Sequence, residues 1–397
     1  MAAAYEEERA PGLEEADVVT KYKMGAEMLN RALQHVASLC VEGASVLELC
    51  EAGDAAMEKE VGTVFNKKVE GQLIPKGIAF PTCININEIL FNYSPLKSDK
   101  PTQLKAGDVV KIDMGLHLDG YIVVNAHTVV VGASAAAPVT GRKADAILAA
   151  YYACEVAARL IKPGNKSSDV TAAIQKVVKT FNCNAIEGML SHIASYQMEH
   201  DELMSEKSIN QNPSEAARKD IKVHTFEANE VYAIDVLVST GEGKARQTAN
   251  RATVFRPTGE LYQLKLKHAR QFFGEVQKKT SNKPMAITLR GFENEAQTKM
   301  GVKECVEHGL IQPMEVMADK EGEYVAQFRV TTLLMPNGNL KITTGGFDPA
   351  TCKSEFSIED EEIKKILSQN LSAKAGKKKK KNNKKKADEA ASAGDAN

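Results

Sequence analysis

The chain has 397 residues, 43% of them hydrophobic and 26% charged, which is typical of a globular protein with a large core. No apolar stretch approaches the roughly 18 residues of a membrane span, and the acidic first residues predict no secretory signal. The seven cysteines are scattered and form no C-x-x-C pair, which favours reduced thiols in the cytoplasm or nucleus over disulfides or a zinc cluster.

Charge is distributed unevenly along the chain. The net charge is −1, but residues 371–397 contain nine lysines against three acids, a net of +6, so residues 1–370 carry −7. We expect residues 372–397 to be a disordered lysine-rich tail, because they have too few apolar side chains to form a core. We also expect residues 1–16 to be a disordered acidic arm.

Helical patterns dominate two separate parts of the first half of the chain. Apolar residues recur at three- and four-residue spacing over 17–43, and a second helix is expected over 46–65. The order of helix, glycine break and helix returns over 144–177. This faint duplication suggests two similar α/β halves joined near 132–143.

A β-hairpin is expected between these two parts. A buried strand begins at Val109, its partner covers Tyr121 to Val131, and residues 115–120 supply the reversal, with Asp-Gly as the turn. Asp113 is unusual because it stands in a mostly apolar strand, where an unpaired charge is costly. Either it closes the strand and binds turn amides, or it belongs to a functional site.

The second half is more mixed. Strands are expected over 230–239 and 324–335, and the stretch 252–317 between them is basic, with two helical segments. A helix over 356–371 precedes the tail. The cations at the start of the basic stretch are Lys265, Lys267, Arg270, Lys278, Lys279 and Lys283.

Four short blocks follow one another in order along the chain. They are Gly77-Ile-Ala-Phe-Pro-Thr82, Lys111-Ile-Asp-Met-Gly115, Val231-Tyr-Ala-Ile-Asp235 and Ala326-Gln-Phe328. Together they resemble the signature blocks of the type II methionine aminopeptidases, which are pita-bread-fold metallopeptidases. The resemblance implies an α+β fold of two pseudo-symmetric α/β halves over 17–355, with the helical type II insertion at about 250–315.

Other segments are similar to a branch of this family that lacks peptidase activity. They are residues 18–25, 95–99, 139–145 and 186–192, together with the lysine tail. That branch implies binding to ribosomal and other structured RNA, and association with ribosomes and ribonucleoprotein particles. It also implies translation control and contacts with receptor-tail and transcription-repressor proteins, in the cytoplasm and in the nucleus including the nucleolus.

The same resemblance implies that the metal site is lost. The peptidases hold two divalent metals with two Asp, one His and two Glu. The matching positions here are Asp113, Val124, His192, Asp235 and Arg329, and Asn92 stands at the catalytic histidine. Four negative ligands become two and a cation is added, so the site changes from about −4 to about −1 and repels M²⁺. We therefore expect no cofactor, and an ion pair of Arg329 with Asp113 or Asp235.

Three classes of function stay open: an RNA- and protein-binding factor, an active aminopeptidase, and a scaffold without an RNA role. The tail lysines expected to bind RNA are Lys377, Lys378, Lys379, Lys380, Lys381, Lys384, Lys385 and Lys386. Candidate RNA or ribosome contacts in the insertion are Lys265, Lys267, Arg270, Lys278 and Lys279. The tail could instead serve only nuclear import or solubility.

Two smaller segments match the non-peptidase branch. Lys21 and Lys23 match a pair linked to nucleolar retention, with an ordinary solvated helix face as the alternative. Residues 363–367, Ile-Lys-Lys-Ile-Leu, stand where the branch has a helical motif for repressor partners. An ordinary amphipathic helix is the favoured interpretation of that segment.

Overall fold

The computed structural model of the chain describes residues 11–69, 71–193, 207–215, 217–219, 221–292 and 295–371, with only the backbone for 192, 193, 217 and 295–297. Residues 1–10 of the expected acidic arm and the whole expected tail, 372–397, lie outside these ranges. The end of the arm packs against the domain. Tyr121 Oη donates a hydrogen bond to the Pro11 carbonyl at 2.8 Å, and Leu13 is buried. The arm therefore joins the fold earlier than residue 17.

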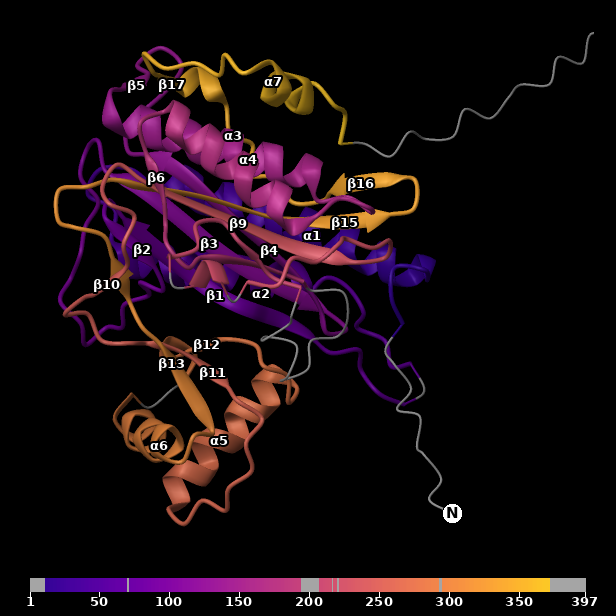
Figure 1. The fold of residues 1–397 in the computed structure, drawn as a ribbon. Coiled ribbons are helices and arrows are strands. Elements are labelled where there is room, and N and C mark those ends of the chain that lie inside the picture. Colours follow the sequence, from indigo (N-terminus) through magenta and orange to yellow (C-terminus); the bar gives the residue numbers. More distant parts are fainter. Residues whose placement is uncertain are drawn as a thin grey trace, which may run out of the picture.

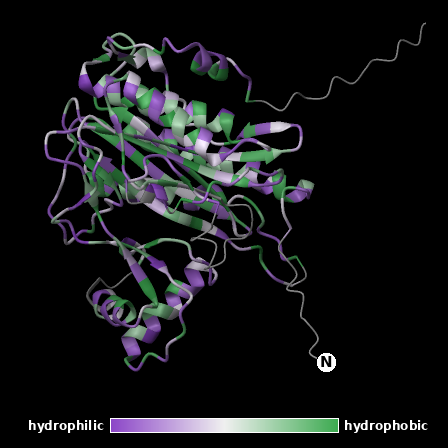
Figure 2. Cartoon of the chain, in the orientation of Figure 1, coloured by the Kyte–Doolittle hydropathy of each residue, from purple (hydrophilic) through white to green (hydrophobic). Residues whose placement is uncertain are grey.

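A nine-stranded sheet is the centre of the described residues, with the strand order β1-β3-β4-β15-β9-β7-β8, β16 paired to β15 and β6 paired to β9. The strands are β1 (Lys76–Ile86), β3 (Val109–Leu118), β4 (Tyr121–Val130), β6 (Asn184–Ala185), β7 (Leu190–Ile193), β8 (Ile209–Asn210), β9 (Val231–Ser239), β15 (Val325–Met335) and β16 (Gly338–Lys341). Figure 2 shows hydrophobic residues along much of this sheet. β15 pairs with β4 on one side and with β9 on the other, and so joins the two halves.

The expected hairpin is confirmed as β3–β4, but its reversal is shorter than predicted. Strand pairing continues to Leu118 opposite Tyr121, so only Asp119 and Gly120 form the turn, with φ values of 56° and 78°. Gly115 was assigned to the reversal and lies inside β3 instead. A Cβ at Gly115 would stand 3.0 Å from Phe80 Cβ, so glycine here permits close packing of the strands.

Two pairs of helices cover one face of the sheet, one pair on each half (Figure 1). α1 (Ala16–Leu39) and α2 (Val46–Val61) pack on β1, β3 and β4. α3 (Arg142–Leu160) covers β9 and β15, and α4 (Ser167–Thr180) packs on α3, β6 and β8. Each half has its own buried apolar cluster. The predicted second helix ends at Val61, short of Phe65, which has φ 50° and so cannot continue it. Among the described residues, no helix is long and apolar enough to cross a membrane.

The stretch expected as the insertion is a separate layer below the main sheet in Figure 1. It contains α5 (Lys267–Thr280) and α6 (Glu295–Glu307), together with a three-stranded sheet of β12 (Ile287–Thr288), β11 (Val254–Pro257) and β13 (Ile311–Met314). Its own apolar cluster includes Phe272, Phe292 and Leu310. The stretch is therefore helix and sheet together, with a small core that the main sheet does not supply.

A buried arginine fastens this layer to the first half of the sheet. Arg290 lies in the 3₁₀ turn η3 (Leu289–Gly291) and is 6% exposed. Its guanidinium contacts Asp54 Oδ2 at 2.7 Å and Ser94 Oγ at 2.5 Å. The other oxygen of Asp54 accepts the backbone N–H of Thr82 at 2.8 Å. One carboxylate on α2 thus holds both β1 and the insertion.

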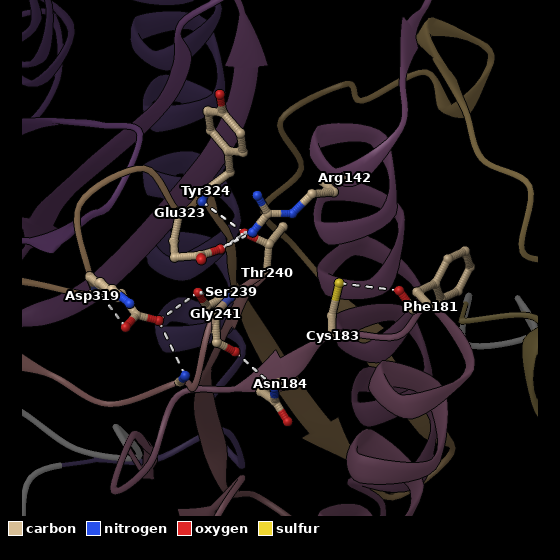
Figure 3. A network of polar contacts seen from close by, with 12 residues as sticks. Arg142, Phe181, Cys183, Asn184, Ser239, Thr240, Gly241, Asp319, Glu323 and Tyr324 are labelled. Atoms are coloured by element: carbon tan, nitrogen blue, oxygen red, sulfur yellow. Dashed lines mark hydrogen bonds and ion pairs between the residues drawn. The ribbon is translucent and has the colours of Figure 1, made fainter.

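A second polar network joins the chain leaving the insertion to the other half (Figure 3). A short sheet of β10 (Arg246–Gln247), β14 (Met317–Ala318) and β2 (Ile89–Phe91) precedes it. The buried Asp319 carboxylate accepts the Ser239 hydroxyl at 2.6 Å. Glu323 accepts the Thr240 hydroxyl and the guanidinium of Arg142. These contacts fix the start of β15 to the end of β9 and the start of α3.

The C-terminal segment returns over α3 (Figure 1). β17 (Cys352–Lys353) follows the 3₁₀ turn η4 (Pro349–Thr351) and pairs in parallel with β5 (Val139–Thr140). The helix predicted over 356–371 is only α7 (Glu361–Leu367), because Asp360 caps its N-terminus by accepting two backbone N–H groups. Ile363 and Ile366 are buried in the α3 cluster, which agrees with an amphipathic helix.

Alanine substitutions at two helical glycines can test how closely α2 packs on the sheet. A Cβ at Gly53 would lie 2.4 Å from Thr82 Oγ1 and 3.0 Å from Thr82 Cβ, whereas a Cβ at Gly274 in α5 would meet nothing within 4 Å. Gly53→Ala is expected to lower the free energy of unfolding by about 1–3 kcal/mol through overpacking. The control Gly274→Ala should raise it by about 0.5–1 kcal/mol. Urea unfolding of both variants measures this, and equal shifts would contradict the close packing.

Candidate functional site

Four strands place the candidate metal-site positions in one row. Asp113 on β3 pairs with Ala126 on β4, Ala126 pairs with Arg329 on β15, and Arg329 pairs with Asp235 on β9. Residues directly opposite one another in a sheet point to the same face. Val124 is two residues from Ala126 on β4 and so shares this face. We call Asp113, Val124, Asp235 and Arg329 the relict site.

Arg329 makes the ion pairs that its sequence position suggested. Its Nη1 lies 3.3 and 3.4 Å from the two carboxylate oxygens of Asp113, and its Nε lies 3.6 Å from Asp235 Oδ2. Gln327, which also faces this side of β15, donates from Nε2 to Asp235 Oδ1 at 2.9 Å. The guanidinium also lies 5.6 Å from the centre of the Phe80 ring. A single cation is thus shared between two carboxylates.

Burial makes the charged forms of these side chains costly. The side chains of Asp113, Asp235 and Arg329 are 4%, 10% and 17% exposed. Burial raises the pKa of both carboxyl groups, that of Asp235 to about 6, while the charge of Arg329 lowers both. The negative charge of Asp113 further raises the pKa of Asp235. Arg329 therefore offsets only part of the cost of burying two carboxylates.

An apolar lid covers the side of the relict site where a metal ligand is missing. Val124 packs with Ala79, Ile122, Ala233 and Met285, all of them buried. Met285 comes from the insertion and is held there because the N–H of Ala286 donates to the Ala79 carbonyl at 3.0 Å. Neither Val124 nor Met285 has an oxygen or nitrogen in its side chain that could bind a hard metal ion.

The relict site does not fit the two divalent metals that the resemblance to type II methionine aminopeptidases would imply. Only two carboxylates remain, and both are engaged by Arg329 and Gln327. Among the described side chains there is no group of three or more His, Cys, Asp or Glu that could hold a metal ion. The backbone of His192 pairs with Ala233 in the sheet, but its side chain lies outside the described residues.

Asn92, at the position of the catalytic histidine, has a structural role here. It adopts a φ of 68°, a left-handed conformation that asparagine tolerates better than most residues. Its Nδ2 donates to the Glu315 carbonyl at 2.9 Å, which links the short strand β2 to the chain that leaves the insertion.

The candidate basic residues differ in their surroundings. The eight tail lysines lie outside the described residues. Lys265, Lys267, Arg270, Lys278 and Lys279 are all exposed on the insertion. Arg270 also donates to the carbonyls of Leu264 and Lys265. These cations lie on and just before α5, in the layer below the main sheet in Figure 1.

Lys21 and Lys23 differ in exposure. Lys21 is mostly buried and its ammonium lies 2.8 Å from Asp119 and 2.6 Å from Asp17, so the solvated-face alternative is wrong for it. Lys23 is exposed. Lys21 thus fastens α1 to the turn of the β3–β4 hairpin.

Sequence reasoning missed two residues of the site. Gln327 stands two positions before Arg329, so strand periodicity alone could have placed it on the same face. Met285 is far from the site in sequence, and no local pattern indicates that the insertion folds back over Val124.

Comparison with known proteins agrees with this geometry. The model of metallopeptidase family M24 matches residues 20–282. ERBB-3 binding protein 1 of Arabidopsis thaliana is 40% identical over 372 residues, 93% of this chain and 90% of that protein. A curved DNA-binding protein of Schizosaccharomyces pombe is 36% identical over 368 residues, 92% and 93% of the two chains. The solved structure of a thermophilic Arx1 has a TM-score of 0.80 at 33% identity, covering 90% of this chain and 99% of that one. These matches confirm the pita-bread fold and the branch that the sequence indicated.

Removal of Arg329 should make stability depend strongly on pH. Without its charge the pKa values of Asp113 and Asp235 rise further above the unfolded value of about 4. Between the unfolded-state pKa of about 4 and the raised folded-state pKa values, the folded state binds more protons than the unfolded state. The free energy of unfolding therefore falls as pH rises through this range. Arg329→Met is expected to cost about 3–5 kcal/mol at pH 8 and clearly less at pH 5. Chemical unfolding at both pH values measures this.

The control for this experiment is a triple variant that carries Arg329→Met with Asp113→Asn and Asp235→Asn. Because it has no carboxylates at this site to protonate, the site should contribute no pH dependence to the free energy of unfolding of this variant. A pH-independent loss in Arg329→Met itself would show that packing, and not charge, is what Arg329 contributes.

Proposed function

Because the chain belongs to metallopeptidase family M24 and yet carries Arg329 between its two remaining site carboxylates, we propose that it acts by binding and not by hydrolysis. We propose an RNA- and ribosome-associated regulatory protein that acts in ribosome biogenesis, translation control and growth-linked transcription repression. The observation that carries the proposal is the bridging position of Arg329.

The absence of hydrolysis is argued from charge. A divalent cation at this position would have to displace the guanidinium of Arg329 or be repelled by it, because the guanidinium stays protonated at all physiological pH values. Val124 supplies no ligand where the peptidases have a bridging carboxylate, and Met285 occupies the space beside it. A metal-bound water of the kind that attacks amides therefore has no site on these residues.

RNA binding is supported first by the tail. Eight lysines fall within the ten residues 377–386, and such a segment follows a phosphate backbone by charge density without reading base sequence. The name of the curved DNA-binding relative is consistent with nucleic-acid affinity in this branch.

The insertion supplies a second candidate surface, which would select structured RNA or ribosomal RNA. Lys265 and Lys267 are exposed at the start of α5. Beside them in sequence, Tyr262 stacks on His308 with ring centres 3.7 Å apart, and Leu261 is 94% exposed. Cations next to exposed rings are the chemistry that binds phosphates and unstacked bases.

Protein partners are proposed from the relative that binds ErbB-3 and from the family branch. They are receptor-tail and transcription-repressor proteins. We propose that the chain binds them in the cytoplasm and in the nucleus, including the nucleolus. The segment 363–367 could reach such a partner only after leaving α3, because Ile363 and Ile366 are buried there. Of the nucleolar-retention pair, Lys23 is the one exposed to a partner.

Metal content and peptidase activity test the loss of hydrolysis. Purified protein is expected to contain no stoichiometric Co, Mn, Fe or Zn, and to release no N-terminal Met from peptides in buffers that supply these metals. Elemental analysis and a peptide assay measure this, with an active type II methionine aminopeptidase as the control. Two metal equivalents per chain together with Met release would identify an active aminopeptidase instead.

The salt dependence of RNA affinity tests the tail. Each lysine paired with a single-stranded phosphate contributes a slope of about −0.7 in log K against log salt, so four to six contacts give about −3 to −4. Truncation before Lys374 should flatten the slope by that amount and weaken binding most at low salt. The control replaces Lys265, Lys267 and Lys278 by Gln in the full chain. This variant should bind structured RNA more weakly, but the contribution of the tail to the slope of log K against log salt should stay the same. Equal slopes for full-length and truncated protein would leave import or solubility as the role of the tail.

A further inference from the structure

A shallow cavity of about 640 Å³, largely open to solvent, lies where the two halves of the chain meet, away from the relict site. The end of β4, the connecting loop before α3, the first residues of α3 and Tyr324 at the start of β15 form its walls. Nothing in the proposed RNA and protein contacts uses it.

The charges on the cavity wall are all positive. Its lining includes Arg142 and Lys143 and no acidic residue, although residues 1–370 as a whole carry a net charge of −7. Glu323 binds Arg142 from outside the lining (Figure 3). Lys143 is half-buried, and among the described residues no carboxylate lies within ion-pair distance of it. Its ammonium therefore has an unbalanced charge that an anion could neutralise.

Lys143 is also held in place. It donates one hydrogen bond to the Gly107 carbonyl, and its ammonium lies 4.7 Å from the centre of the Tyr324 ring. An ammonium has three N–H donors, so donors remain for a ligand oxygen after the carbonyl is satisfied. Because the side chain is already ordered, an incoming anion does not have to order it.

The rest of the wall suits a flat apolar group. Val130, Pro138 and Val139 contribute aliphatic surface, and Tyr324 contributes a ring. Aliphatic and aromatic surface next to fixed cations is the combination that recognises a base together with a phosphate. We propose that this cavity binds a nucleotide, with its phosphate on Lys143 and its base against Tyr324 and Pro138. The nucleotide could be free or the 5′-phosphorylated end of an RNA strand, and both sources present the same chemistry.

The test is calorimetric titration of full-length protein with AMP, adenosine, inorganic phosphate and a 5′-phosphorylated trinucleotide of adenosine. AMP should bind saturably and at least about tenfold more tightly than adenosine or phosphate, because losing a hydrogen bond to a charged group typically costs a factor of about 10 or more. A trinucleotide whose affinity exceeds that of AMP, with an excess that Ala137→Glu removes, identifies an RNA end as the source, because binding by the tail lysines does not depend on residue 137. Equal affinities of the trinucleotide and AMP identify a free nucleotide. No saturable AMP binding, or phosphate binding as tightly as AMP, would overturn the proposal.

Two variants and a matched control make the site specific. Lys143→Met should weaken AMP binding at least about tenfold, whereas Lys162→Met, an exposed lysine just beyond the other end of α3, should not. Ala137→Glu places a carboxylate on the wall at an exposed residue, and should weaken binding without unfolding the protein, even if Lys143→Met is unstable. Unchanged AMP affinity in Ala137→Glu would overturn the proposal. All of these proteins keep the tail. A negative result for AMP binding would therefore not change the conclusion drawn from the salt dependence of RNA affinity.

Discussion

The positive charge of Arg329 is the interaction on which the centre of the sheet depends. Asp113 and Asp235 stand in one row of the sheet, on strands from different halves, and both are buried. Two buried carboxylates without a cation would repel each other and lose their hydration. In the metallopeptidases two metals provide the balancing charge, whereas here a side chain from the strand between them provides it. The ion pairs of Arg329 thus link strands of the two halves.

The insertion contributes to this centre as well as projecting from it. Met285 covers Val124, and Arg290 binds the carboxylate of Asp54 on α2. Both contacts reach residues of the first half of the sheet. A large insertion that only hung from its two connections would move independently, but these buried contacts make it part of the same packed body. Its exposed basic residues are thus presented from a fixed direction.

The sequence predicted the parts of the structure that local pattern controls. Asp113 and Arg329 were placed together because the motif blocks fix their strands, and the hairpin followed from its turn dipeptide. Gly115 was misplaced because a glycine in a strand resembles a turn residue until the neighbouring Phe80 is known. Lys21, Met285 and the short extent of α7 could not be predicted, since each depends on a partner distant in sequence or on one cap.

The position of β15 has a consequence for the order in which the chain folds. β1, β3 and β4 are complete by residue 130, and α1 and α2 precede them, so the first half can form from local contacts while synthesis continues. β9, however, is joined to that half in the strand order by β15, which ends at Met335. A nascent chain must therefore carry its edge at β4 unpaired until the insertion and β15 have left the ribosome. During that interval the unpaired edge of β4 is available for pairing with another chain.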